Sequence, residues 1–255
     1  YVGENQKPFV IAEIGINHMG SYKLCKQMVI SACKSGASAI KLQTINENES
    51  YMKHTSSYKI FKNKNLSDEN LLKLKMIAEK YGLVFFTTPG DISSLGRIKK
   101  LGIKLIKISS GLMTNLPLVE EAIKTKLPLI ISLGMAYESE ILKVKKLLNK
   151  YNQKKYVFLK CTAEYPTKDS FVNISGMATI KTKFKSLVGY SDHTLDDLAC
   201  IHAVALGAVV IEKHFTIDNR IKGADNKISM TPKEFKSMII KINRMILQKG
   251  NKKIM

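Results

Sequence analysis

Short apolar runs rich in β-branched residues alternate along the whole chain with stretches of helical periodicity. The runs predict strands at Phe9–Ile16, Ala39–Thr44, Leu83–Thr88, Leu105–Ser110, Leu129–Leu133, Val157–Thr162, Leu187–Tyr190 and Val209–His214. Helices are predicted between them, among others at Tyr22–Lys34, Asp68–Tyr81, Glu138–Lys150, Asp196–Leu206 and Pro232–Gln248. The strands are continuously apolar instead of alternating, which is typical of a parallel sheet covered on both faces.

This repeated order of strand and helix predicts an α/β protein of the (β/α)8 TIM-barrel class. The length suits one barrel, so we expect residues 1–255 to form a single barrel domain. Glycines that favour left-handed helix caps stand between a helix and the next strand, at Gly36, Gly82, Gly102 and Gly207. The polar stretch Asn46–Asn65 follows the second strand and is predicted to be a lid or a dimer contact.

Composition and charge exclude several classes of protein. No apolar run approaches the roughly 20 residues of a membrane span, so no membrane partner is expected. The chain carries 41 basic and 21 acidic residues, a net charge of +20. Without an RNP motif, zinc knuckle or basic heptad region, this charge favours attraction of small anions over nucleic-acid binding. Four cysteines without CxxC spacing indicate reduced, buried thiols of a cytoplasmic protein, and Cys161 is interpreted as core instead of a nucleophile.

Polar residues stand at the C-terminal end of every predicted strand, where a barrel of this class carries its chemistry. They include Glu13, Lys41, Thr88, Lys107, Ser110, Ser132, Ser191 and Glu212. Two lysines and several hydroxyls that converge on one mouth predict a phosphate site. One alternative stays open, in which both lysines pair with the two glutamates in a structural ion-pair network.

Two histidines, His193 and His214, end strands that only one helix-length segment separates. Adjacent strands of a parallel barrel place such residues side by side at the mouth. Two imidazoles with oxygen ligands suit Mn²⁺, Fe²⁺, Co²⁺ or Zn²⁺, and the lack of thiolates argues against a structural zinc. An ion held there polarises a carbonyl group or orients a water molecule.

With these motifs in order, the chain resembles the sialic acid synthase family, and specifically its N-terminal phosphoenolpyruvate-condensing barrel. The resemblance rests on Ile11–His18, Lys41–Thr44, Lys107–Gly111, Cys161–Thr162 with Tyr165–Pro166, Gly189–Thr194 and Ile211–Thr216. It implies a metal-dependent transferase that joins phosphoenolpyruvate to an N-acylated hexosamine and releases phosphate. The product is a nonulosonic acid of the N-acetylneuraminate or legionaminate type.

The resemblance also implies a role for each candidate residue. His193 and His214 hold a Mn²⁺ ion, with Mg²⁺ or Co²⁺ as alternatives, and Glu13 is the catalytic carboxylate. Tyr165 and Asp225 contact the acylated sugar. The phosphate and carboxylate of phosphoenolpyruvate are held by Lys41, Thr88, Lys107, Ser110, Ser132 and Ser191. A homodimer is implied as well, and the small antifreeze-like domain that usually follows the barrel is expected to be absent from this chain.

Three residues depart from the family pattern around the sugar. Leu112 stands where an acidic residue is usual, Asn226 where many members have histidine, and Leu133 where a small hydroxyl residue is usual. Two alternatives stay open: a barrel that binds phosphoenolpyruvate or phosphate without turnover, which Leu112 and the expected absence of the second domain favour, and another metal aldolase-like barrel. A preference for sialic or legionaminic over pseudaminic acid rests on Tyr190 and Thr194.

Overall fold

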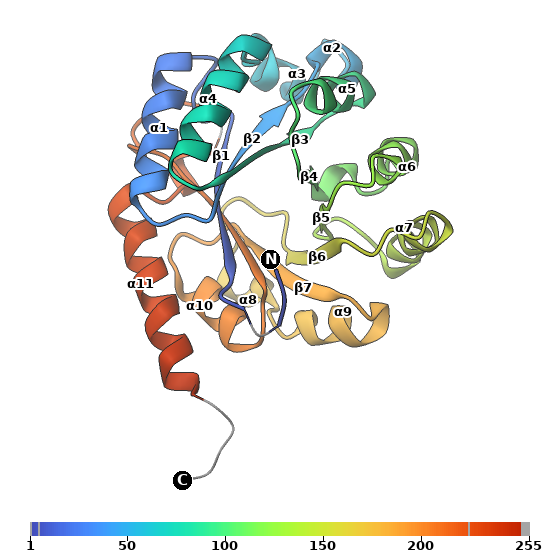
Figure 1. The fold of residues 1–255 in the computed structure, drawn as a ribbon, viewed down its shortest axis with the longest axis vertical. Helices are drawn as coiled ribbons and strands as arrows, with labels where there is room; N and C mark the ends of the chain where they lie inside the picture. Colours follow the sequence, from blue (N-terminus) through green and yellow to red (C-terminus); the bar gives the residue numbers. More distant parts are fainter. Residues whose placement is uncertain (1, 5, 224, 251–255) are drawn as a thin grey trace.

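Eight parallel strands close into a barrel in the computed structural model, which describes residues 2–4, 6–223 and 225–250 (Figure 1). The strands are β1 (Phe9–Gly15), β2 (Ala39–Thr44), β3 (Val84–Pro89), β4 (Ile106–Ile108), β5 (Leu129–Ser132), β6 (Tyr156–Cys161), β7 (Leu187–Asp192) and β8 (Val210–His214). Each strand pairs with its neighbour in sequence, and β8 pairs with β1 to complete the closure. The (β/α)8 prediction is therefore confirmed.

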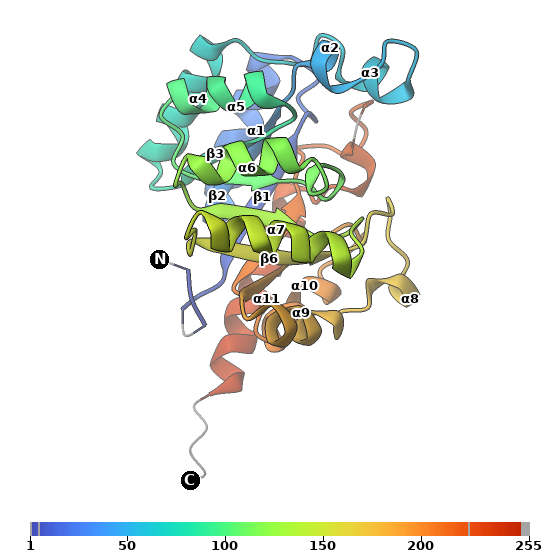
Figure 2. The same cartoon turned by 90° about the vertical axis from the view of Figure 1, so that its right-hand side faces the viewer.

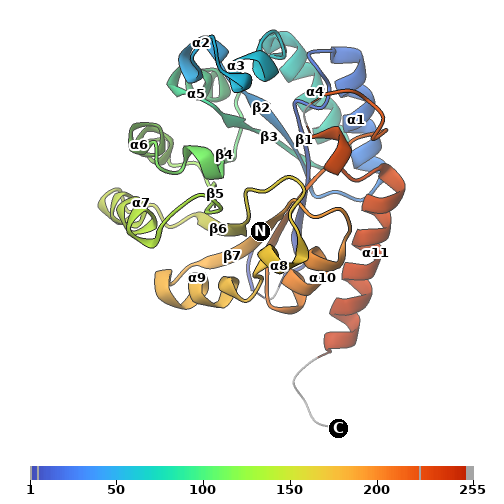
Figure 3. The same cartoon turned by 180° about the vertical axis from the view of Figure 1, so that it is seen from behind.

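Helices surround this barrel, as the views from the front and from behind show (Figure 1 and Figure 3). They are α1 (Tyr22–Lys34), α2 (Glu47–Ser50), α3 (Ser56–Phe61), α4 (Asp68–Lys80), α5 (Ile92–Lys100), α6 (Leu116–Lys124), α7 (Glu138–Lys150), α8 (Asp169–Val172), α9 (Gly176–Phe184), α10 (Leu198–Ala205) and α11 (Pro232–Lys249), with short 3₁₀ turns η1 (Ser110–Leu112) and η2 (Asn226–Ile228). Among the described residues, no helix combines the length and the apolarity that crossing a membrane requires.

The boundaries agree with the predicted ones to within a few residues, and the differences have local causes. The four predicted cap glycines have positive φ angles of 90°, 75°, 63° and 96°, a region that side chains other than glycine seldom occupy. Strand β4 is shorter than predicted because the chain turns into η1 directly after Ser109. Strand β7 is longer, and it carries Ser191 and Asp192 inside the sheet.

The polar stretch 46–65 folds into α2 and α3 and is fastened to the barrel. The Asp91 carboxylate accepts hydrogen bonds from the Asn46 backbone N–H at 2.7 Å and from the Ser50 hydroxyl at 3.0 Å. Figure 2 shows α2 and α3 on the side away from the N-terminus, together with α8. That side holds the C-terminal ends of the strands, as predicted. A role as lid or dimer contact stays a prediction.

Gly189 on β7 is a position where the barrel tolerates no side chain. A Cβ atom there would lie 2.5 Å from the Val210 carbonyl oxygen and 2.6 Å from Leu159 Cδ2. Because the first of these atoms belongs to the backbone of β8, the clash cannot be relieved by a rotamer change.

We expect Gly189→Ala to lower the free energy of unfolding by roughly 1–3 kcal/mol, because two strands must separate to admit the methyl group. The matched control is Gly96→Ala in α5, where an added Cβ meets no atom within 4 Å. There, the gain in helix propensity should raise stability by up to about 1 kcal/mol. Urea titration of both variants measures the contrast, and equal midpoints would contradict it.

Candidate functional site

Four charged side chains meet inside the mouth of the barrel and form one network. Lys41 Nζ lies 2.8 Å from Glu13 Oε2 and 3.7 Å from Glu212 Oε2. Lys107 Nζ donates to Glu212 Oε1 at 2.8 Å. All four residues are at most 4% exposed. The lysines therefore do pair with the glutamates, as one of the two sequence interpretations proposed, and the network is charge-balanced.

The pairing register of the strands places the charged side chains at the same height along the barrel. Glu13 on β1 is the register partner of Lys41 on β2 and of His214 on β8. The β1–β2 register then shifts between Glu13 and Gly15, an irregularity of the kind found beside active sites. Gly15 has a φ of +54°, and a Cβ atom there would lie 3.2 Å from Glu13 Oε1. Glycine thus lets the backbone turn close against the carboxylate.

Hydroxyl groups surround the network. Thr88 Oγ1 accepts from Lys41 Nζ at 3.2 Å, and Ser191 Oγ donates to Glu212 Oε1 at 3.0 Å. Ser110 Oγ accepts from the Gly134 backbone N–H at 3.0 Å. Ser132 is buried at the end of β5, and its hydroxyl has no partner among the described residues. The predicted substrate-binding lysines and hydroxyls therefore lie at the same end of the barrel.

The two glutamates differ in acidity although they share Lys41. Burial raises the pKa of Glu13 to about 7, and Lys41 only partly offsets this. For Glu212, burial acts in the same direction, but Lys107, Lys41 and the Ser191 hydroxyl together lower its pKa to about 2. Two carboxyl groups with separated pKa values are typical of a division between a proton-transferring group and a permanently charged one.

The two lysines also differ. Burial opposes the charged form of both, but Glu13 and Glu212 outweigh it at Lys41 and raise the pKa of that lysine. At Lys107, burial together with the nearby Lys41 cation lowers the pKa despite the Glu212 contact.

His193 and His214 lie side by side, with ring centroids 5.4 Å apart, as predicted from adjacent strands. His193 Nδ1 lies 2.7 Å from the Thr162 carbonyl oxygen, which can only accept, so Nδ1 carries the proton and Nε2 keeps its lone pair. His214 Nδ1 is buried without a hydrogen-bond partner among the described residues, 3.8 Å from Asp225 Oδ2.

His193 and His214 have some of the properties that ligands of a divalent cation need. Burial lowers the pKa of His193 to about 4 and that of His214 to about 3, so both rings are neutral at pH 7, as metal ligands must be. An imidazole nitrogen binds such an ion at about 2.0–2.1 Å, which rings at this separation can do together. The described residues hold no group of three or more His, Cys, Asp or Glu side chains arranged for an ion. Remaining coordination positions would belong to water or substrate.

Tyr165 and Asp225, the predicted sugar contacts, flank the histidines. The Tyr165 ring stacks on His193 with centroids 4.0 Å apart, and the residue is 52% exposed. Asp225 reaches toward His214, and burial raises its pKa. Its backbone N–H donates to Asn17 Oδ1 at 3.1 Å. Cys161 is buried as predicted, but beside His193 at the mouth instead of in the core, and burial raises the pKa of its thiol.

The three residues that depart from the family pattern have different surroundings in the structure. Leu112 in η1 and Leu133 after β5 both pack against the apolar core. Asn226 is fully buried; its amide accepts from Thr216 Oγ1 and donates to the Gly223 carbonyl of its own loop and to the Asn17 carbonyl after β1. Asn226 therefore shapes the loop that carries Asp225.

Tyr190 and Thr194, on which the preference for sialic or legionaminic over pseudaminic acid rests, both contact Asp192; their contacts do not test that preference, which stays a prediction. The Tyr190 hydroxyl and the Thr194 hydroxyl both donate to the Asp192 carboxylate, at 3.0 and 2.8 Å. Asp192 also accepts from Cys200 in α10, so this cluster lies between strand and helix. Alternation along β7 turns these side chains away from the barrel interior.

Sequence reasoning gave no functional role to Glu212, Gln43 or Asn17. Glu212 lies at the centre of the charge network, and Gln43 Nε2 donates to Glu13 Oε1 at 3.1 Å. The Asn17 amide donates to the Phe215 carbonyl and to Ser229 Oγ. A signal was present for each, because all three are polar residues within motifs that end strands.

Buried polar atoms without a hydrogen-bond partner concentrate at this mouth. Among the described residues they are Ser132 Oγ, His214 Nδ1, Glu212 Oε2 and, away from the site, Ser186 Oγ; Glu13 Oε2, by contrast, is paired with Lys41 Nζ at 2.8 Å. Leaving such atoms unpaired costs free energy, so their concentration indicates a place where a polar ligand supplies partners.

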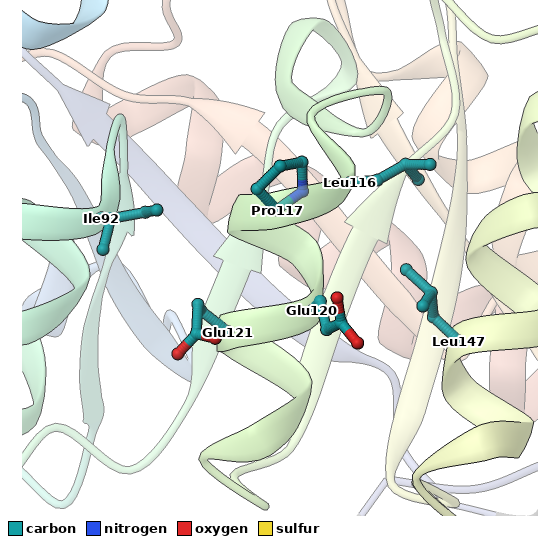
Figure 4. Close-up of a pocket in the computed structure, with 6 residues that line it drawn as sticks. All are labelled: Ile92, Leu116, Pro117, Glu120, Glu121 and Leu147. Atoms are coloured by element: carbon teal, nitrogen blue, oxygen red, sulfur yellow. The ribbon is translucent and has the colours of Figure 1, made fainter.

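A groove on the outer wall of the barrel has no such chemistry. This groove of about 450 Å³ is lined by Ile92, Leu116, Pro117, Glu120, Glu121 and Leu147 (Figure 4). Its two carboxylates are already engaged, Glu120 by Lys150 and Tyr151, and Glu121 by Lys124. The barrel mouth is therefore the candidate functional site.

Known proteins are similar to this chain in sequence and in fold. The model of the NeuB family matches residues 28–254. An uncharacterized protein of Methanocaldococcus jannaschii is 41% identical over 99% of this chain and 75% of its own length. The N,N′-diacetyllegionaminic acid synthase of Legionella pneumophila is 37% identical over 98% of this chain and 76% of its own.

Among solved structures, the N-acetylneuraminic acid synthetase of Leptospira borgpetersenii, in complex with citrate, matches with a TM-score of 0.95. It is 33% identical, and the match covers all of this chain and 89% of that one. The predicted homodimer and cytoplasmic location are not tested by these findings and stay predictions. The chain belongs to the NeuB family, whose named members are acid synthases that form carbon–carbon bonds as transferases.

Proposed function

We propose that this chain condenses phosphoenolpyruvate with an N-acylated hexosamine, either N-acetylmannosamine or a related diacetamido sugar. The product is a nonulosonic acid of the N-acetylneuraminate or legionaminate type. The observation that carries the proposal is the convergence of two buried lysines, with Thr88 and Ser191, on the mouth that also holds two neutral imidazoles. The names of the Legionella and Leptospira relatives support the same substrate class.

The proposed reaction balances with water as the third reactant. C3 of phosphoenolpyruvate forms a bond to the aldehyde carbon of the open-chain sugar, and positive charge develops at C2. Water adds at C2, the bond from C2 to the phosphate oxygen breaks, and inorganic phosphate leaves. The water brings two protons: one, lost as it adds at C2, balances the proton that the aldehyde oxygen takes up, and the other leaves with phosphate as C2 becomes a carbonyl.

The charge network suits the anionic substrate in this scheme. Lys41 and Lys107 act as point charges for phosphate and carboxylate, and Thr88, Ser110, Ser132 and Ser191 add hydrogen bonds. A phosphate group that enters competes with Glu13 and Glu212 for the ammonium groups. Glu13, with a pKa near 7, can take up a proton as that negative charge arrives. Its carboxyl group is then ready to exchange a proton in the reaction.

We further propose that His193 and His214 hold one divalent cation, Mn²⁺ with Mg²⁺ or Co²⁺ as alternatives. When bound, the ion supplies a Lewis acid at the aldehyde oxygen. Tyr165, stacked on His193, and Asp225, beside His214, are placed to contact the acylated sugar that must lie between the ion and phosphoenolpyruvate.

A second candidate function is binding of phosphoenolpyruvate without turnover. The observation in its favour is Leu112, a leucine packed against the core where the resemblance calls for an acidic sugar contact. A leucine cannot accept hydrogen bonds from sugar hydroxyls, so acceptor binding would be weakened while the anion site stays intact.

Phosphate release from phosphoenolpyruvate should require both Mn²⁺ and an N-acylated hexosamine. A panel of N-acetylmannosamine and diacetamido sugars identifies the acceptor by its rate. Pyruvate in place of phosphoenolpyruvate should give no product, because the proposed chemistry needs the enol. Tight calorimetric binding of phosphoenolpyruvate without release with any sugar would select the binding-only function, and product from pyruvate would indicate an aldolase.

Glu13→Gln should lower kcat by about 10²- to 10⁴-fold, the usual contribution of a group that transfers a proton. Phosphoenolpyruvate binding by calorimetry should change little, because glutamine keeps the shape of the neutral acid. Glu121→Gln on the outer wall is the matched control, with unchanged kinetics. A Glu13→Gln variant that turns over at the wild-type rate would remove this residue from the mechanism.

Stability should depend on pH in opposite ways through the two glutamates. The pKa of Glu13 is raised to about 7 on folding, so its contribution to stability is lost as pH rises from 4.5 through 7. The pKa of Glu212 is lowered to about 2, so its contribution is present above pH 4.5 and lost as pH falls toward 2.

At pH 8, Glu13→Gln should therefore be more stable than the wild type by roughly 1–3 kcal/mol, and Glu212→Gln less stable by a similar amount. At pH 5 the stability that Glu13→Gln gains over the wild type should shrink toward zero, whereas the stability that Glu212→Gln loses should still be missing. Urea unfolding at the two pH values measures this. Equal losses for both variants at pH 8 would mean that Glu13 is ionised in its pair with Lys41.

A further inference from the structure

A second buried ion pair, between Asp192 and Lys213, lies directly behind the two histidines. Asp192 precedes His193 in the chain, and Lys213 precedes His214. The two charged residues are register partners on β7 and β8, and both side chains are fully buried. Because side chains alternate along a strand, the ion pair faces the helices while the histidines face the mouth.

Lys213 uses all three of its ammonium protons. Its Nζ donates to Asp192 Oδ2 at 2.5 Å, to the Thr194 carbonyl at 2.5 Å and to the Asp196 carbonyl at 2.9 Å. An ammonium group has three donors, so the lysine is saturated. One side chain on β8 thereby fastens the end of β7 and the loop that leaves it.

The Asp192 carboxylate likewise has hydrogen-bond partners on both of its oxygens. One oxygen accepts from the Thr194 backbone N–H at 3.1 Å and the Tyr190 hydroxyl at 3.0 Å. The other accepts from Lys213, from the Thr194 hydroxyl at 2.8 Å and from Cys200 at 3.5 Å. The residues on both sides of His193 are therefore fixed, and the peptide that carries its ring has little freedom.

Stability alone does not explain this pair. Taking two charges out of water costs several kcal/mol each, and apolar residues of similar volume often do as well or better at such a place. Directional contacts do explain it, because an apolar pair could fill the space but could not bind the Thr194 and Asp196 carbonyls.

We propose that the Asp192–Lys213 pair is a positioning device that sets the separation of the His193 and His214 rings for one divalent cation. This inference rests on the proposed function, in which those rings hold the ion. Metal–nitrogen distances tolerate only about ±0.2 Å, so a small relative shift of β7 and β8 weakens binding strongly. Residues that orient metal ligands typically contribute about 10- to 100-fold to affinity.

The test is Mn²⁺ binding to metal-free protein by calorimetry, with the paired substitution Asp192→Leu and Lys213→Met. This double variant removes both charges together and leaves neither one buried alone, so it should fold. Its Mn²⁺ affinity should fall by about 10- to 100-fold, while its phosphoenolpyruvate affinity stays unchanged. Equal affinity for Mn²⁺, or an equal loss for both ligands, would overturn the inference.

Two further variants keep the test decisive. Asp192→Asn keeps the size of the side chain but not its charge, and it should weaken Mn²⁺ binding by about tenfold even if the double variant does not fold. Wild-type affinity in folded Asp192→Asn overturns the inference. Lys241→Met is the matched control, since it breaks the exposed pair of Lys241 with Asp197, 2.7 Å apart, and should leave Mn²⁺ binding unchanged.

A failure of the proposed metal site can be distinguished from a failure of this inference. A wild-type protein that binds no Mn²⁺, Mg²⁺ or Co²⁺ defeats the proposed function and this inference with it. This inference alone fails if the wild-type protein binds Mn²⁺ through His193 and the Asp192–Lys213 double variant binds Mn²⁺ with the same affinity. Loss of Mn²⁺ binding in His193→Asn would show that His193 is a ligand.

Discussion

The buried network of Glu13, Lys41, Lys107 and Glu212 is the constraint on which the rest of the site depends. Four charges inside a barrel are tolerated only when each finds a partner, and here the two signs balance. Outside this network, the Ser132 hydroxyl and His214 Nδ1 are buried at the mouth without a partner among the described residues. The site is thus balanced in charge and keeps a hydroxyl group and an imidazole nitrogen available for a ligand.

The surroundings of this network divide the mouth into two halves. Both lysines and most of the hydroxyls come from β2, β3, β4 and β5, whereas the two imidazoles and the Ser191 hydroxyl come from β7 and β8. Glu13 on β1 is the register partner of one residue from each half, Lys41 and His214. A net charge of +20 on the whole chain favours the approach of anions toward this balanced interior.

Much of the fold could be predicted from the sequence because barrel strands are continuously apolar and helices are periodic. The strand positions held within a few residues, and β4 was predicted too long because Ser109 and Ser110 read as strand while their backbone turns into η1. The site residues could be listed because each ends a strand. Their pairing stayed one of two alternatives, because it depends on strand register: the sequence could not decide whether Lys41 and Lys107 meet Glu13 and Glu212 or only a ligand.

The sequence by itself determined the barrel, the set of polar residues at its mouth and the family resemblance, because these depend on local pattern and residue type. Tertiary structure alone decided which way each residue faces and what it touches. Tyr190 and Thr194 stand beside the histidine motif in sequence, yet they turn outward to Asp192. Asp192 and Lys213 stand one residue from each histidine, yet they meet behind the wall. Side chains alternate along a strand, so neighbours in sequence serve opposite faces.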